Sequence, residues 1–131
     1  MVGILIVEDE PQLATYIQEV FTRAGYDRAD IAASAAEALS LVSQHRPDLV
    51  LMDIRLRGDM DGIELACELA RRYSIRTVFL SGALDSDTLE RARAAKPLGF
   101  LSKPFLPSHV FSAVEQALSE MMAHERTGNL P

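Results

Sequence analysis

The sequence predicts an α/β fold in which a parallel sheet carries helices on both faces. Stretches typical of strands and helices alternate five times along the chain, and such βα repeats form parallel sheets with right-handed crossovers. Residues 49–52 (LVLM) are continuously apolar and end at Asp53, which is typical of a strand buried on both faces. The 131 residues, 48% of them hydrophobic, can bury a core without metal or disulfides. We therefore expect one domain whose strands all end at the same edge.

The first two strand–helix units have distinct boundaries. Residues 2–7 (VGILIV) are apolar and rich in β-branched side chains, as expected of a strand. Pro11 suits the first position of the helix that follows, and Gly25 ends that helix. Residues 27–32 form a weaker strand that we expect at an edge of the sheet. Ser34 begins a capping-box pattern that opens the second helix.

The third helix is expected to bury small side chains. Residues 58–62 (GDMDG) form a loop by composition, and residues 75–80 (IRTVFL) form the strand that comes after the helix. Cys67 has no second cysteine to pair with and fits the apolar pattern, so we expect a core residue rather than a reactive thiol. The inner face of this helix is predicted to consist of Ile63, Ala66, Cys67 and Ala70.

The last two helices differ in the apolar surface that they offer. The helix of residues 85–95 has a thin apolar stripe, so we expect it to be the most mobile. After a short strand at residues 98–101, Pro107 opens the last helix. Residues 123–131 are polar and are expected to form a frayed tail, which limits the domain to residues 1–122. The inward residues of the last helix are predicted to be Val110, Phe111, Val114, Leu118 and Met121.

Composition excludes several classes of protein. A net charge of −6 and only two lysines argue against a nucleic-acid-binding protein, which needs clustered Lys and Arg. We identify no signal peptide and no apolar run long enough to span a bilayer, so we expect a cytoplasmic protein with no membrane partner.

Acidic residues end two of the predicted strands. Glu8 and Asp9 follow the first strand, and Asp53 ends the third. If these strands are neighbours, three carboxylates converge, and they repel one another unless a cation is bound. An all-oxygen site of this kind is typical of Mg²⁺. Zinc is not favoured, because no histidine stands at a strand end; the three are His45, His109 and His124.

Two further strand ends complete a site for phosphoryl chemistry. Ser81 ends the fourth strand and Lys103 ends the fifth, which adds a hydroxyl and a positive charge near Asp53. A cation, a metal and a hydrogen-bond donor around one aspartate would stabilise charge on the oxygens of a transferred phosphoryl group. Asp53 is then the natural nucleophile, and it needs no general base because its carboxylate is already ionised.

Five short motifs stand at or beside the predicted strand ends. They are LIVEDE at residues 5–10, DLVLMDIRL at 48–56, DG at 61–62, SGA at 81–83 and GFLSKPF at 99–105. In this order and spacing, the chain resembles the receiver domain of two-component response regulators over residues 2–122. The resemblance implies a flavodoxin-like (βα)5 three-layer sandwich with a five-stranded parallel sheet of order 2-1-3-4-5.

The resemblance also implies roles for the acidic residues. Asp53 is expected to accept the phosphoryl group. Glu8, Asp9, Asp53 and the backbone carbonyl of Arg55 are expected to bind Mg²⁺. The Arg55 side chain is hypothesised to shield the phosphoryl group and tune its lifetime. Asp59 and Asp61 lie in a loop that is longer than usual and lacks the usual proline, and we expect loop and cap residues there rather than metal ligands.

The remaining matched residues concern the response to phosphorylation. Lys103 is expected to pair with a phosphoryl oxygen, and the Lys103–Pro104 bond is expected to be cis. Ser81 is expected to be the switch hydroxyl and Phe100 the switch aromatic, in place of a frequent tyrosine. A core aromatic without a switch role is the alternative for Phe100.

The resemblance implies a signalling function rather than an enzyme. A histidine kinase or phosphotransfer protein is the expected phosphodonor. The last two helices and the strand between them are the expected contact for a downstream protein target or for a homodimer. We expect a stand-alone receiver without a DNA-binding domain. The alternatives are a phosphorylation-independent pseudo-receiver and a receiver excised from a larger regulator or hybrid kinase. A phosphatase is disfavoured because Arg55 stands where those enzymes need an acid.

Overall fold

Five parallel strands form one sheet in the order β2-β1-β3-β4-β5, which confirms the predicted fold class. The computed structural model describes residues 2–26 and 28–128, with side chains of the last stretch described to residue 123. Asp27, the predicted start of the second strand, and the last three residues of the predicted tail lie outside this range. The strands are β1 (Gly3–Val7), β2 (Arg28–Ala32), β3 (Leu49–Asp53), β4 (Arg76–Ser81) and β5 (Gly99–Ser102). The helices are α1 (Pro11–Arg23), α2 (Ala35–Gln44), α3 (Gly62–Tyr73), α4 (Ser86–Ala94) and α5 (Pro107–Gly128).

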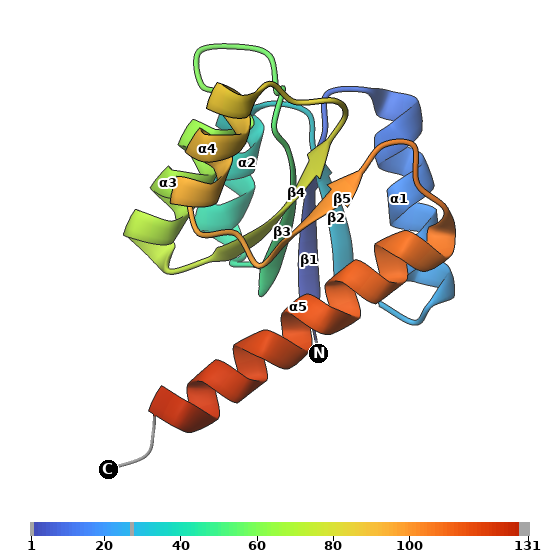
Figure 1. The fold of residues 1–131 in the computed structure, drawn as a ribbon. Coiled ribbons are helices and arrows are strands. Elements are labelled where there is room, and N and C mark those ends of the chain that lie inside the picture. The colour runs from blue at the N-terminus through green and yellow to red at the C-terminus, as the bar shows by residue number, and fades with distance from the viewer. Residues whose placement is uncertain (1, 27, 129–131) are drawn as a thin grey trace.

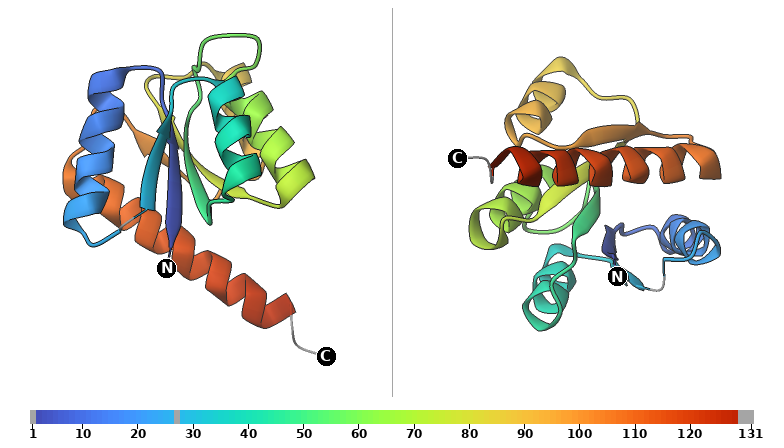
Figure 2. Two further views of the ribbon diagram at one scale, coloured as in Figure 1. Left: turned by 180° about the vertical axis from the view of Figure 1, so that it is seen from behind. Right: turned by 90° about the horizontal axis from the view of Figure 1, so that it is seen from below.

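The sheet separates two hydrophobic cores. The helices α2, α3 and α4 cover one face, and α1 and α5 cover the other (Figure 1). The view from behind shows α1 on one side of the sheet and α2 and α3 on the other (Figure 2, left). Alternate residues of β3 serve the two cores: Val50 and Met52 face α2 and α3, whereas Leu49 and Leu51 face α1 and α5. All five residues of β3 are buried, as expected of the central strand.

The strand register brings the carboxyl ends together at one edge. Val7 of β1 pairs with Met52 of β3, so the acids that follow Val7 lie beside Asp53. Asp53 pairs with Leu80 of β4, which precedes Ser81. This edge is the upper one in Figure 1, where the loops that follow β1 and β3 lie.

The predicted inner face of α3 is wrong in part. Cys67 and Ala70 are exposed, whereas Leu65 and Leu69 are fully buried beside Ile63 and Ala66. Burial of a leucine side chain is favoured over burial of an alanine or a cysteine because it removes more apolar area from water. The helix is therefore rotated so that its two leucines, rather than its small residues, contact the sheet.

The helix α4 has the thin packing that the sequence predicts, since only Ala92 in it is buried.

The predictions for α5 need two corrections. Phe111 is 37% exposed rather than buried, whereas Ala117, which was not predicted to face inward, is buried. The helix also continues to Gly128 rather than ending near residue 122. Its C-terminal part projects beyond the sheet (Figure 1). Within residues 2–26 and 28–128, no helix combines the length and the apolar composition needed to cross a bilayer.

Candidate functional site

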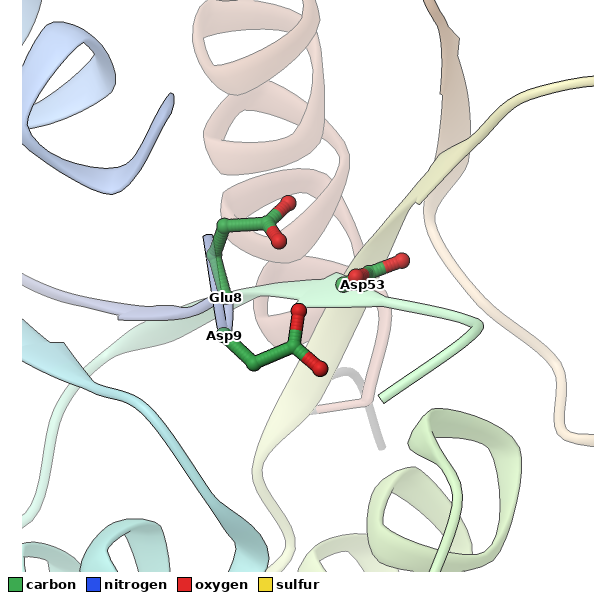
Figure 3. A group of neighbouring side chains, drawn as sticks. All are labelled: Glu8, Asp9 and Asp53. Carbon is green, nitrogen blue, oxygen red and sulfur yellow. The ribbon is translucent and has the colours of Figure 1, made fainter. Parts of the chain in front are cut away.

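Three carboxylates converge at the carboxyl ends of β1 and β3. Glu8 and Asp9 follow β1, and Asp53 is the last residue of β3. One carboxylate oxygen from each of the three lies within 4.8 Å of the others. Figure 3 shows the three side chains gathered at the ends of the two strands. The predicted convergence of the acids is thus present in the structure.

Main-chain N–H groups orient each of these carboxylates. Arg55 N donates to Oδ1 of Asp53 (3.0 Å), and Arg57 N donates to Oδ2 of Asp9 (3.1 Å). Glu10 N donates to Oε2 of Glu8 (3.2 Å). Two of these three donors belong to the loop between β3 and α3, so that loop holds the acids from both strands.

Two of the three acids in the cluster are buried. Glu8 is 1% exposed and Asp53 is 5% exposed. Burial and the neighbouring Asp53 carboxylate raise the pKa of Glu8 from its usual 4.5 to about 7, although the Glu10 N–H and Lys103 act in the opposite direction. The cluster therefore holds more negative charge than its surroundings favour near neutral pH.

Lys103 supplies a positive charge from the end of β5. Its ammonium nitrogen lies 3.2 Å from Oε1 of Glu8 and 3.7 Å from Oδ1 of Asp53. Lys103 N also donates to the carbonyl oxygen of Ser81 (2.7 Å), which ties the end of β5 to the end of β4. The Lys103–Pro104 peptide bond is cis in the structure.

A cleft of about 760 Å³ opens above the acids. Arg55 and Arg57 contribute basic side chains to it, and Arg55 Nη2 donates to the carbonyl oxygen of Ala83 (3.3 Å) across the cleft. Sequence reasoning did not identify Arg57, whose Nε lies 3.8 Å from Oδ2 of Asp9. No sequence signal marks it, because its contact depends on the path of the loop.

The two predicted switch residues, Ser81 and Phe100, differ in how far they are exposed. Ser81 is 6% exposed at the end of β4, next to the strand that carries Asp53. Phe100 on β5 is 37% exposed, and its ring centroid lies 5.9 Å from that of Phe79. Phe100 is therefore not a core residue, and its role as a switch stays a prediction.

Asp61 is a helix cap, as expected. Its Oδ1 accepts from Glu64 N (2.9 Å), and Asp61 N donates to Oε1 of Glu64 (3.1 Å), which is a complete capping box at the start of α3. Its other oxygen, Oδ2, lies 3.2 Å from Nη2 of Arg91 on α4. Asp59 is exposed in the preceding loop.

The donor set fits a hard divalent cation. All three side chains offer oxygen, the ligand atom that Mg²⁺ prefers. One bound cation would offset both the burial and the repulsion from Asp53 that raise the pKa of Glu8. The cleft also leaves room for water and for a phosphoryl group beside Asp53. The arrangement can therefore hold a cation and place an anionic group between it and Lys103.

The chain is similar in sequence to known proteins. A family model described as the response regulator receiver domain matches residues 4–115. The transcriptional regulatory protein PdtaR of Mycobacterium tuberculosis is 36% identical over 116 residues, which are 88% of this chain and 56% of PdtaR. Sporulation initiation phosphotransferase F of Bacillus subtilis is 33% identical over 116 residues, which are 88% of this chain and 92% of that protein. The chain thus spans about half the length of PdtaR.

Solved structures show the same fold. The signal receiver domain of a modulated diguanylate cyclase from Desulfovibrio desulfuricans G20 matches with a TM-score of 0.86 at 31% identity, covering 93% of this chain and 97% of that chain. A CheY-like response regulator receiver domain protein from Methanospirillum hungatei JF-1 also matches with a TM-score of 0.86, at 25% identity, covering 95% and 98% of the two chains. The family model covers most of the chain, and the chain therefore belongs to the receiver domain family of two-component response regulators.

Proposed function

We propose that this receiver accepts a phosphoryl group on Asp53 in a Mg²⁺-dependent reaction with a phosphohistidine donor. The observation that carries the proposal is the convergence of three carboxylates within 4.8 Å, with the Lys103 ammonium 3.7 Å from Asp53. The donor is a histidine kinase or a phosphotransfer protein, the class of partner with which receivers of this family interact. The name of the B. subtilis relative, a phosphotransferase similar over 92% of its length, is consistent with this role.

Glu8, Asp9 and Asp53, with the backbone carbonyl of Arg55, would hold the Mg²⁺ ion. When bound, the ion supplies positive charge to the oxygens of the phosphoryl group as it is transferred. The raised pKa of Glu8 supports this assignment, because a cation at that position removes the electrostatic cost of ionising the group.

Asp53 acts as the nucleophile. One of its carboxylate oxygens forms the bond to phosphorus while the bond between phosphorus and the donor imidazole nitrogen breaks, and the electron pair of that bond returns to the imidazole. Lys103 moves from Glu8 toward the new phosphoryl oxygens and forms a charge-assisted hydrogen bond with one of them. In this proposal the protein catalyses only the transfer of a phosphoryl group to its own Asp53 and the later loss of that group, and it is not an enzyme acting on other substrates.

Phosphorylation then shifts the population of conformations. Ser81 moves toward the new oxygens, and Phe100 rotates inward from its exposed position. The helix α4, which buries only Ala92, follows at low cost because it has few apolar contacts to break. Each tenfold change in the active fraction needs about 1.4 kcal/mol, which one or two charge-assisted hydrogen bonds can supply. A protein target or a second copy of the chain reads the face formed by α4, β5 and α5.

Uptake of phosphate from acetyl phosphate tests the proposal. The wild type should gain one phosphoryl group in Mg²⁺ and none in EDTA, as measured by intact mass and by mobility in a phosphate-affinity gel. Asp53→Asn should gain none, whereas Asp59→Asn, which alters an exposed acid of the neighbouring loop, should behave as wild type. Acid-stable phosphate on Asp53→Asn, or uptake without Mg²⁺, would contradict the assignment. A wild type that takes up no phosphate would instead be an interaction module independent of phosphorylation.

A further inference from the structure

The helix α3 begins in direct contact with the main chain that carries Asp53. A Cβ atom at Gly62 would overlap the carbonyl oxygen of Asp53, and it would lie 2.8 Å from the Asp53 carbonyl carbon and 2.9 Å from Cα of Ile54. All three atoms belong to the backbone and cannot rotate away as a side chain would. Gly82 and Gly99, by contrast, have nothing within 4 Å of a built Cβ. Position 62 therefore needs glycine for space.

Hydrogen bonds hold this contact from both sides. Gly62 N donates to the carbonyl oxygen of Ile54 (3.1 Å), and Ile54 N donates to the carbonyl oxygen of Leu80 on β4 (3.1 Å). The capping box of Asp61 and Glu64 sets the residue at which the helix begins. The end of β3 is thus fixed between β4 and the first turn of α3, and neither side can yield without losing hydrogen bonds.

The same short stretch of main chain organises the acidic cluster. Arg55 N donates to Oδ1 of Asp53 (3.0 Å), and Arg57 N donates to Oδ2 of Asp9 (3.1 Å). The two donors come one and three residues after Ile54 in the chain, so a displacement of Asp53 and Ile54 would move two of the three carboxylates at once.

We propose that Gly62 is a positioning residue for phosphoryl transfer to Asp53. Because it has no side chain, α3 can begin against Asp53 and Ile54, and this contact holds the Asp53 carboxylate where it meets the cation and the donor. The inference rests on the proposed phosphorylation of Asp53. Misplacement of a reacting group by about 1 Å can slow a reaction on the order of 100-fold, so the contact has a measurable consequence.

Gly62→Ala tests the inference against a second destabilised variant of the same helix. Leu69→Ala alters a fully buried residue of the same helix that takes no part in the acidic cluster, and it is expected to destabilise the fold as well. Both variants are compared with wild type at a temperature where circular dichroism shows all three folded. At saturating acetyl phosphate and Mg²⁺, we expect Gly62→Ala to be phosphorylated roughly 10- to 100-fold more slowly than wild type. Leu69→Ala should stay within about twofold of wild type, because loss of stability alone does not slow a folded protein.

A second readout separates positioning from a general structural role. The affinity for Mg²⁺, measured by titration calorimetry, should weaken in Gly62→Ala and remain unchanged in Leu69→Ala. If Gly62→Ala does not fold, Asp61→Ala loosens the same helix start without adding an atom, and it should slow phosphorylation several-fold. Arg91→Ala is its control, since it removes the Asp61–Arg91 ion pair and leaves the cap in place.

The outcomes distinguish this inference from the proposed function. A wild type that takes up no phosphate would overturn both. A wild type that is phosphorylated on Asp53, with Gly62→Ala equal to Leu69→Ala in rate and in Mg²⁺ affinity, would overturn only the role of Gly62. An unchanged rate in Asp61→Ala would do the same where Gly62→Ala cannot be measured.

Discussion

The ammonium group of Lys103 lies 3.2 Å from the carboxylate of Glu8, closer than it lies to Asp53 at 3.7 Å. The two residues are 95 positions apart in the chain, and they meet because β1 and β5 end at the same edge of the sheet. Before phosphorylation, Lys103 therefore offsets the charge of a buried acid, and phosphorylation would provide it with a stronger partner.

Lys103→Met should raise the pKa of Glu8 further. The ammonium favours the ionised carboxylate, so its removal leaves only the Glu10 N–H to oppose burial and Asp53. Titration of the glutamate side-chain carboxyl carbons by NMR, in the absence of divalent cations, would measure the shift. Lys96→Met is the matched control, because Lys96 is exposed and lies away from the acidic cluster. An unchanged pKa of Glu8 in Lys103→Met would show that this ion pair has no electrostatic effect.

Without divalent cations, stability should fall as the pH rises from 4.5 to 7. The pKa of Glu8 is about 7 in the folded protein and 4.5 in the unfolded chain, so in this window only the folded state retains the proton. The stabilisation is complete below pH 4.5 and is lost above about pH 7. Its slope is on the order of 1.4 kcal/mol per pH unit at most. Urea unfolding in EDTA at several pH values should show this slope in wild type, and Glu8→Gln should lack it; equal slopes would refute the pKa.

Mg²⁺ should stabilise the protein against unfolding. An ion that binds only the folded state raises the free energy of unfolding by about 2.7 kcal/mol at 100 times its dissociation constant. Thermal unfolding with increasing MgCl₂ would measure the effect. Asp9→Asn should lose most of it, whereas Asp59→Asn, an acid outside the cluster, should retain it. Equal stabilisation of these two variants would place the cation elsewhere.

Arg55→Ala should shorten the lifetime of the phosphoryl group. The Arg55 side chain reaches across the cleft to the carbonyl oxygen of Ala83, where it can screen the phosphoryl group from water. An exposed charge contact contributes up to about 1 kcal/mol, which corresponds to roughly two- to fivefold faster dephosphorylation. The decay of purified phosphoprotein would be followed by phosphate release, with Arg46→Ala as a remote control. Unchanged decay in Arg55→Ala would remove the hypothesis.

Thr77→Val should stabilise the fold. Thr77 is 4% exposed, and its hydroxyl oxygen has no hydrogen-bond partner among the described residues. Valine has nearly the same shape and removes the cost of burying an unpaired hydroxyl, so we expect a gain of about 1 kcal/mol in the free energy of unfolding. Thr22→Val is the contrasting control, since the Thr22 hydroxyl donates to the carbonyl oxygen of Gln18 (3.0 Å). A loss of stability in Thr77→Val on urea unfolding would contradict this account.

The sequence by itself determined the fold class and the membership of the acidic cluster. Apolar runs, Pro11 at a helix start and the cap at Ser34 are local signals, and the structure places strands and helices where those signals predict them. Once the strands are parallel, every strand end lies at one edge. The placement of Glu8, Asp9 and Asp53 together follows from that geometry and needs no side-chain detail.

Only the tertiary structure decided which faces of the helices are buried and which atoms meet in the site. Cys67 and Phe111 fit the apolar periodicity and are nevertheless exposed, because the rotation of a helix depends on the total apolar area that it can bury against the sheet. The contact of Arg57 with Asp9 and the space that requires Gly62 depend on the path of the loop after β3. Such contacts join residues far apart in the chain through distances of a few ångströms, and no local pattern in a sequence records a distance of that kind.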